Sequence, residues 1–397
     1  MNEAQTGELL LLLAVLFGLA FLLGGLLEKW RIPGILGALF VAMAAHYTPM
    51  GGVLSQGTPG SAFAFLGNLG VLFLLFFIGM QIDLGEMRSL SRDIVWATVL
   101  NTAFPFLFGM AVMLWLGYGW MVAFVIGLTR MPTAEAVIVP ILDEFQMVRT
   151  RVGEFIIGVG VLDDVIEVFL VAFVSVWIGG QTLGVQGTQR EVVDILVSLA
   201  LFALAAWLVY RWILPFLANW LPRRPRNLIL LSMLVMFAFG GFSEHSHLGM
   251  VVGAIVSGVL LRPVFNQAGS SGEQTVAAIR AISYGFFGII FFFWVGLSVD
   301  LGGMVEQPEL ATLLFLAAFV GKLVGIFLMV PMHKLSRREA WVVGVGLNAR
   351  LTTEIIVAKL LLDARLIDVQ LFTALVAASS LSTVVVPVAF TLMVKRS

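Results

Sequence analysis

The fold is decided by the stretch GVGVLDDVIE at residues 158–167, which lies inside an apolar run from about 155 to 177. Asp163 and Asp164 are adjacent there, and Glu167 follows one helical turn later. On a helix Glu167 shares a broad face with both aspartates, because residues three and four positions apart are neighbours. An ionised acid at the centre of a bilayer costs about 3 kcal/mol or more, so carboxylates placed there indicate a functional site.

The composition is that of a membrane protein. Hydrophobic residues make up 60% of the 397 residues and charged residues only 12%, and apolar runs of about 20 residues recur, as membrane-spanning helices require. The alternating strands of an outer-membrane barrel are absent. A net charge of −1 gives no reason to expect nucleic acid, and the absence of cysteine excludes disulfides and thiol chemistry. We therefore expect an all-α integral membrane protein in contact with lipid, with the first apolar segment retained as a span.

Thirteen apolar segments follow one another along the chain. Placing the N-terminus outside and the C-terminus inside puts 16 of the 23 Lys and Arg residues in inner loops and the C-terminal segment, as the positive-inside rule predicts. The expected spans are 7–27, 32–48, 60–82, 94–117, 121–145, 153–178, 192–218, 227–242, 248–262, 281–300, 307–331, 338–362 and 367–393.

The two halves of the chain resemble each other. FFIGMQIDLGEM at 76–87 and FWVGLSVDLGGM at 293–304 share six of twelve positions. A shift of 219 residues also places Thr133 on Thr352, and LDDV at 162–165 on LSTV at 381–384. Matched spans are seven apart, an odd number, so each pair crosses the membrane in opposite directions. We expect inverted repeats over 60–178 and 281–393, the architecture of many secondary transporters with a site near the midplane.

Two of the matched spans carry polar residues at their centres. In span five Pro132 lacks an N–H and is flanked by Thr129 and Thr133, which predicts a broken helix. Span twelve has the polar counterpart NARLTTE at 348–354 without a proline. Two crossed discontinuous helices would bring half-helix ends together at mid-membrane.

Charges beside these breaks have two interpretations. Glu135 and Glu354 can neutralise half-helix N-termini, and Arg350 is placed to pair with Glu354 four residues later. The alternative is that these charges contact the transported ion directly. Lys322 is the only charged residue between Glu309 and Lys334, in the apolar part of span eleven. A buried lysine keeps its charge only beside a carboxylate, so we expect an ion pair with Asp163 or Asp164.

These residues suggest an exchange mechanism. A small cation needs oxygen ligands, and Asp163, Asp164, Thr129, Thr133 and the freed carbonyls can supply them. Competition of H⁺ with Na⁺, K⁺ or Li⁺ for one site, opened alternately to each side, gives antiport. We find no phosphate-binding G-x-x-x-x-G-K-[ST] motif, and we expect a transporter without a bound cofactor rather than an enzyme.

The chain resembles the monovalent cation:proton antiporter superfamily, in its Kef/NapA-like second branch. The resemblance rests on the spans, the inverted repeat, the Asp-Asp pair, Lys322 and the ARLTTE segment at 349–354. It implies an NhaA-like fold, a homodimer, and a core that moves against dimerisation helices, here mainly 1–58 and 192–262. It also implies that Asp164 carries the ion and proton, that Asp163 pairs with Lys322, and that exchange is electrogenic.

The resemblance further implies a bacterial inner-membrane location. Relatives often have Gly where this chain has Leu351, and Arg130, Glu135 and Glu167 are not part of the pattern, which leaves ion selectivity and stoichiometry open. We expect the 397 residues to form one transporter unit without a soluble regulatory domain. The alternatives are a Na⁺-coupled solute symporter or a gated cation channel on the same fold. An intramembrane aspartyl protease is disfavoured because the two aspartates are adjacent.

Overall fold

The computed structural model describes most of the chain in thirteen stretches. These are residues 3–29, 33–48, 57–81, 91–134, 138, 142, 145–148, 150–182, 189–220, 224–246, 248–299, 308–350 and 352–395.

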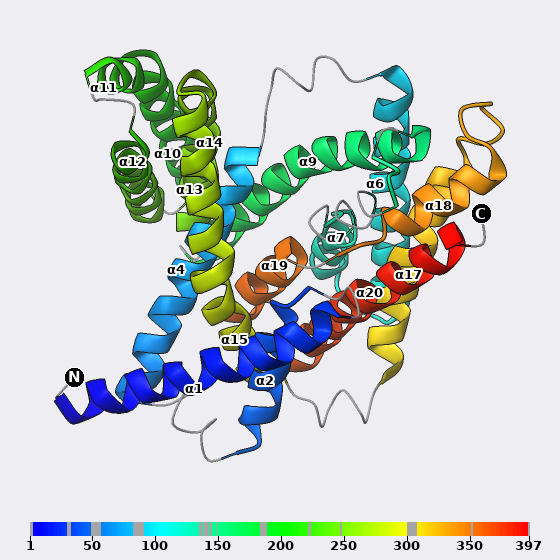
Figure 1. Ribbon diagram of the computed structural model, residues 1–397, viewed down its shortest axis with the longest axis horizontal. Coiled ribbons are helices and arrows are strands. Elements are labelled where there is room, and N and C mark those ends of the chain that lie inside the picture. Colours follow the sequence, from blue (N-terminus) through cyan, green and yellow to red (C-terminus); the bar gives the residue numbers. More distant parts are fainter. Residues whose placement is uncertain are drawn as a thin grey trace. The chain divides into compact units, whose positions relative to one another are not determined.

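Every regular element in these stretches is a helix (Figure 1). Within them, nine helices are long and apolar enough to cross a membrane. The elements are α1 (Glu3–Glu28), α2 (Leu36–His46), α4 (Gly57–Gln81), α6 (Arg92–Trp115), α7 (Trp120–Thr129), α9 (Arg151–Thr182), α10 (Gln189–Leu208), η1 (Val209–Ile213), α11 (Leu214–Trp220), α12 (Pro225–His245), α13 (Met250–Gln267), α14 (Ser270–Ile282), η2 (Ser283–Phe287), α15 (Gly288–Leu297), α17 (Pro308–Phe327), α18 (Arg337–Gly346), α19 (Thr352–Asp363) and α20 (Val369–Lys395), with η1 and η2 π-helical.

The expectation of an all-helical membrane protein is therefore confirmed. Each predicted span contains helix, whereas the number that cross the membrane stays a prediction. One boundary differs clearly: the span expected at 281–300 begins at Ser270, because the amphipathic α14 leads through η2 into α15.

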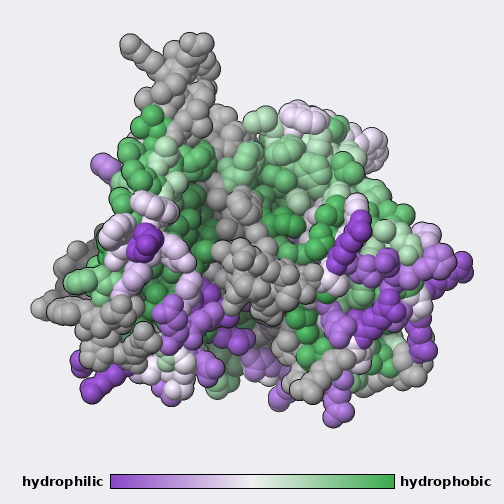
Figure 2. Space-filling view, turned by 90° about the horizontal axis from the view of Figure 1, so that it is seen from above, coloured by the Kyte–Doolittle hydropathy of each residue, from purple (hydrophilic) through white to green (hydrophobic). Residues whose placement is uncertain are grey.

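Large apolar side chains cover much of the surface. Phe21 is 80% exposed, Trp115 75% and Leu11 71%, and Figure 2 shows broad areas of hydrophobic side chains. A soluble protein seldom exposes apolar patches of this extent. Exposed apolar surface of this extent is typical of a membrane protein.

The chain forms two compact units. Unit 1 comprises residues 1–61, 85–170 and 292–397, and unit 2 comprises 62–84 and 171–291. Unit 2 is held by close backbone contacts: a Cβ added to Gly79 would collide with the Ile255 carbonyl oxygen, and one added to Gly258 would collide with that of Phe76. Every described residue of the site below belongs to unit 1.

Two helical runs of unit 1 are interrupted at their polar centres. Helix α7 ends at Thr129, and the chain is non-helical through Pro132 to Ala134. Helix α18 ends at Gly346, and α19 begins at Thr352. Pro132 accounts for the first interruption because it cannot donate a helical hydrogen bond. At the second, the Asn348 side chain donates to the Gly344 carbonyl at 2.8 Å and to the Phe319 carbonyl at 3.2 Å, competing with backbone bonds there.

A capping box starts the second interrupted run. The Ser336 hydroxyl accepts from the Glu339 N–H at 3.2 Å, and the Glu339 carboxylate accepts from the Ser336 N–H at 2.7 Å. Both N–H groups would otherwise lack a partner, because the first turn of a helix leaves its donors free. This cap sets where α18 begins.

Helices α6 and α17 approach each other at glycines. A Cβ added to Gly321 would lie 2.5 Å from the Pro105 Cα, and one added to Gly325 would collide with the Leu100 carbonyl oxygen. Small residues allow backbones to touch in this way. The contact holds Lys322 of α17 against α6.

Replacing Gly325 with valine should therefore separate these helices. The side chain has no space against the Leu100 backbone, and overpacking of this kind typically costs about 1–3 kcal/mol. We expect a lower midpoint of thermal unfolding in detergent. Gly285→Val in η2, where an added Cβ meets nothing within 4 Å, is the control. Equal stability of the two variants would show that α6 and α17 can move apart freely.

Candidate functional site

Asp163 lies at the centre of a buried polar cluster. Asp163 is 1% exposed. Three donors converge on one of its oxygens, Oδ2: the Thr133 hydroxyl donates at 2.5 Å, the Asn101 Nδ2 donates at 3.1 Å, and the Lys322 Nζ lies 3.7 Å away. These groups come from the first interruption, α6 and α17 respectively. They stabilise an ionised carboxylate in an apolar surrounding.

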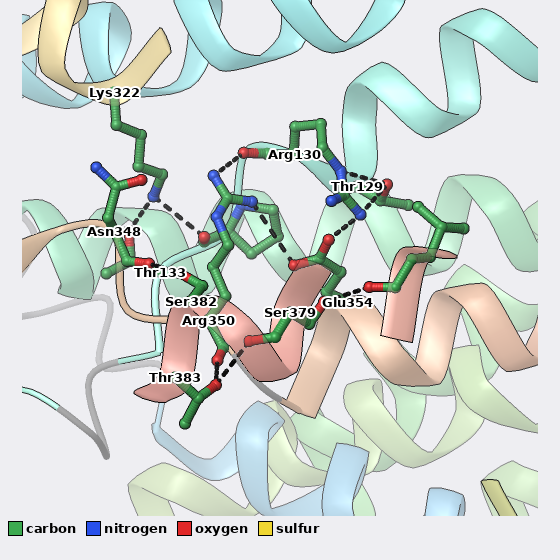
Figure 3. Close-up of polar contacts among 12 residues, drawn as sticks. Thr129, Arg130, Thr133, Lys322, Asn348, Arg350, Glu354, Ser379, Ser382 and Thr383 are labelled. Atoms are coloured by element: carbon green, nitrogen blue, oxygen red, sulfur yellow. Dashed lines mark hydrogen bonds and ion pairs between the residues drawn. The ribbon is translucent and has the colours of Figure 1, made fainter. Parts of the chain in front are cut away.

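Lys322 connects this carboxylate to the interruption after α7. It is fully buried, and its ammonium donates to the Pro132 carbonyl at 3.1 Å and to the Thr133 hydroxyl. The close-up shows Lys322 and Thr133 pointing toward each other (Figure 3). The Thr133 hydroxyl accepts from Lys322 and donates to Asp163, so it links the two charges.

A second ionic cluster lies across the two interruptions. Arg130, which is fully buried, pairs with Glu354 at the start of α19. Arg350 also lies near this carboxylate, with Nη1 3.7 Å from Oε2 of Glu354. The Thr129 hydroxyl accepts from the Arg130 Nε at 3.3 Å and donates to the Ile126 carbonyl at 2.7 Å. In Figure 3 the Arg130 and Glu354 side chains point toward each other.

The two interruptions are also joined through their backbones. The Ala134 N–H donates to the Ala349 carbonyl at 2.7 Å, and the Arg350 guanidinium donates to the Arg130 carbonyl. The Thr133 hydroxyl lies 3.2 Å from the Leu347 carbonyl oxygen. Backbone groups freed by one interruption are thus paired by the other, as polar backbone within a membrane requires.

Helix α20 contacts the second interruption with two hydroxyls. Ser382 donates to the Asn348 carbonyl, and Thr383 donates to the Arg350 carbonyl (Figure 3). These are the two positions that the 219-residue shift aligns with Asp163 and Asp164. A helix with two neutral hydroxyls therefore lies on one interruption, and the helix that carries Asp163 lies on the other.

A sequence model described as "Sodium/hydrogen exchanger, transmembrane" matches residues 10–396. This chain belongs to the sodium/hydrogen exchanger family. The resemblance stated from the sequence to cation:proton antiporters is confirmed.

Proteins that are similar to this chain are named as antiporters. The chain is 24% identical over 376 residues to an Na⁺/H⁺ antiporter of Enterococcus hirae, covering 93% of this chain and 94% of the relative. It is 26% identical over 344 residues to the probable Na⁺/H⁺ antiporter GerT of Bacillus cereus, covering 87% and 88%. Both names describe transporters, in line with the expectation from the sequence.

A solved structure shares the fold. The sodium proton antiporter MjNhaP1 of Methanocaldococcus jannaschii aligns with a TM-score of 0.67 at 14% identity, covering 98% of this chain and 99% of that one. The chain therefore shares its overall fold with this antiporter.

The structure brings together several of the residues predicted from the sequence. Asp163, Thr133 and Lys322 form one cluster, and Arg350 and Glu354 form another. The described polar contacts of Thr129 are to Arg130 and Ile126, and none is to Asp163. Glu135 and the side chains of Asp164 and Glu167 lie outside what the structure describes, so their predicted roles stay predictions.

Two residues of the site do not stand out as such in the sequence. Arg130 is notable there only as an unusual residue beside Pro132, yet it is fully buried and pairs across the interruptions. Asn101 is not among the predicted site residues, although it contacts Asp163. A signal exists for Asn101: with Thr98 and Thr102 it forms a polar stripe along the otherwise apolar span 94–117.

Replacing Lys322 with methionine should lower the stability of the protein and shift the pH dependence of its transport. Methionine fills a similar volume, but Asp163 loses its ammonium partner, and breaking a buried ion pair costs about 3–5 kcal/mol. Thermal unfolding in detergent would measure the first effect, and proton flux as a function of pH would measure the second. Lys334→Met, at a half-exposed pair with Asp93, is the control. An unchanged unfolding midpoint together with an unchanged pH profile would contradict the pairing.

Proposed function

We propose that this protein is a secondary antiporter that exchanges Na⁺, or K⁺ or Li⁺, for H⁺ by alternating access at a mid-membrane site. The observation that carries the proposal is the buried Asp163 carboxylate, held by Lys322, Thr133 and Asn101 beside an interrupted helix. A charge buried in an apolar span is costly and marks an ion or proton pathway. Family membership and relatives named as antiporters support the same reading.

The two aspartates take different roles in the proposal. Asp163 is the partner of Lys322, and Asp164, the next residue of α9, is the carboxylate that binds the cation or the proton. Binding of the cation displaces protons from the site, and reprotonation displaces the cation. In the proposal, the site turns from one side of the membrane to the other only when it holds a cation or a proton. With two carboxylates and a lysine at one site, more protons than cations can move in each cycle, and exchange is electrogenic.

The proposed architecture has about thirteen spans with inverted repeats and two crossed discontinuous helices. Support comes from the interruptions after α7 and α18, which hydrogen-bond to each other. Further support comes from α9 and α20, which lie on opposite interruptions through Asp163 and through Ser382 and Thr383. Half-helix ends and their fixed charges meet there, as in other transporters built from inverted repeats.

The arrangement in the cell completes the proposal. We infer a homodimer in a bacterial inner membrane, with the N-terminus outside and the C-terminus inside. The excess of Lys and Arg in the loops assigned to the inner side supports this orientation.

Purified protein in liposomes tests the proposal. A pH-sensitive dye inside reports an imposed acid-inside gradient, and NaCl, KCl or LiCl is then added outside, with choline chloride and protein-free liposomes as controls. We expect at least one of the three cations to dissipate the gradient. If none does, the antiporter proposal fails, and solute uptake and electrical recording would then test a symporter or a channel.

A further inference from the structure

The environment of Asp163 is asymmetric. All three described polar partners of the carboxylate lie on Oδ2. The other oxygen, Oδ1, is buried and has no hydrogen-bond partner among the described residues. A carboxylate has about four acceptor positions, and those on Oδ1 have no donor among the described residues although they lie in an apolar interior.

Asn101, which bonds to Asp163, also has a side-chain oxygen without a described hydrogen-bond partner. The residue is fully buried. An ionised carboxylate can only accept, so the amide must present its Nδ2 to Asp163 and direct its Oδ1 away from Oδ2. This Oδ1 is also buried without a hydrogen-bond partner among the described residues. A buried acceptor left unsatisfied is destabilising, and two such oxygens in one hydrogen-bonded pair call for a common ligand.

We propose that Asn101 is a cation-binding residue whose amide oxygen and Asp163 Oδ1 together contact the transported cation. The inference rests on the proposed antiport and adds a ligand to that site. Hard cations such as Na⁺, K⁺ and Li⁺ are held by carboxylate and amide oxygens. The amide nitrogen acts at the same time, since its bond to Oδ2 orients Oδ1.

The position of Asn101 is rigid. Helix α6 meets α17 at Gly325, whose added Cβ would collide with the Leu100 carbonyl oxygen and lie 3.2 Å from the Asn101 backbone nitrogen. Lys322 stands one helical turn before Gly325 on α17 and reaches the same Asp163 oxygen as Asn101. Close packing therefore holds the amide against the carboxylate, as a ligand needs to be held.

Asn101→Leu removes both polar atoms and keeps a similar volume. In the liposome assay with NaCl, KCl and LiCl, we expect the apparent KM for the transported cation to rise about tenfold or more, as loss of a site residue typically does. The maximal rate should stay within about twofold, because a change in KM alone reports lost binding. Thr98→Val is the matched control. Among the described residues this buried hydroxyl, one turn earlier on α6, donates to the Ile94 carbonyl at 3.0 Å, and the KM of the variant should equal that of the wild type.

A second readout separates binding from structure. A bound cation raises the unfolding temperature of detergent-solubilised protein, and Asn101→Leu should lose this cation-dependent rise while Thr98→Val keeps it. If the leucine variant does not fold, Asn101→Ala removes the same atoms without bulk.

A wild-type KM and a wild-type cation-dependent rise in an Asn101 variant would overturn the inference. They would assign to Asn101 only the bond to Asp163, with a bound water on the free oxygens. Absence of cation-driven proton flux in the wild type is a different result, since it would defeat the proposed function itself.

Discussion

Asp164→Asn should abolish cation-dependent proton movement in liposomes while leaving the protein folded. Asparagine has nearly the same shape as aspartate, but it neither releases a proton nor carries the negative charge that attracts a cation into an apolar interior. The proton-carrying and the cation-carrying half of the exchange cycle both require a carboxylate at this position. We expect a dye signal equal to that of protein-free liposomes for NaCl, KCl and LiCl, with an unchanged elution profile in detergent.

Asp163→Asn is the informative companion variant. It keeps an oxygen for the cation and leaves Asp164 in place, so we expect exchange to persist. Because one titrating carboxylate is lost beside Lys322, the exchange should lose its response to an imposed membrane potential. Antiport that continues in Asp164→Asn would remove Asp164 from the central role. Antiport that is lost only in Asp163→Asn would reverse the assignment of the two aspartates.

Glu354→Gln should produce a large loss of stability. Glu354 is 2% exposed, pairs with the fully buried Arg130 and lies 3.7 Å from the Arg350 guanidinium. Removing one member of a buried pair leaves an uncompensated charge, which costs about 3–5 kcal/mol. We expect a clearly lower midpoint of thermal unfolding in detergent and a lower yield of folded protein.

The matched control for this variant is Glu309→Gln. Glu309 is an exposed acid in the first turn of α17, and its neutralisation should leave the midpoint nearly unchanged. The fraction of the Glu354→Gln variant that does fold should retain the wild-type apparent KM for the cation, because the pair joins the interruptions and does not bind the ion. A raised KM at wild-type stability would instead place Glu354 in contact with the cation.

Much of the fold can be predicted because it depends on local sequence. Apolar length predicts the spans, Pro132 predicts the interruption after α7, and two carboxylates inside one apolar run single out α9. The interruption between α18 and α19 is less visible, since no proline marks it and only the match to the first half indicates it. Its physical cause is the Asn348 side chain bonding to Gly344 and Phe319, which becomes evident only in three dimensions.

The pairing of side chains cannot be read from the sequence in the same way. Arg350 is expected beside Glu354 because the two are four residues apart, and this pair is indeed 3.7 Å apart. Arg130 has no predicted partner, because nothing local connects it to a carboxylate far later in the chain. The Asn101 bond to Asp163 likewise depends on how closely α6 approaches its neighbours.

Because the two interruptions pair with each other, the earlier one lacks its partner until the later one has been synthesised. Arg130 and Arg350, joined through the Arg130 carbonyl, are 220 residues apart, and Glu354 is synthesised later still. Translation proceeds from the N-terminus, so the segment with Arg130 leaves the ribosome long before its carboxylate partner exists. A lone guanidinium is costly at the bilayer centre. We therefore expect the segment around Arg130 to reach its final packing only after α19, which carries Glu354, has been made, and nascent chains that end before α18 should remain sensitive to membrane proteases.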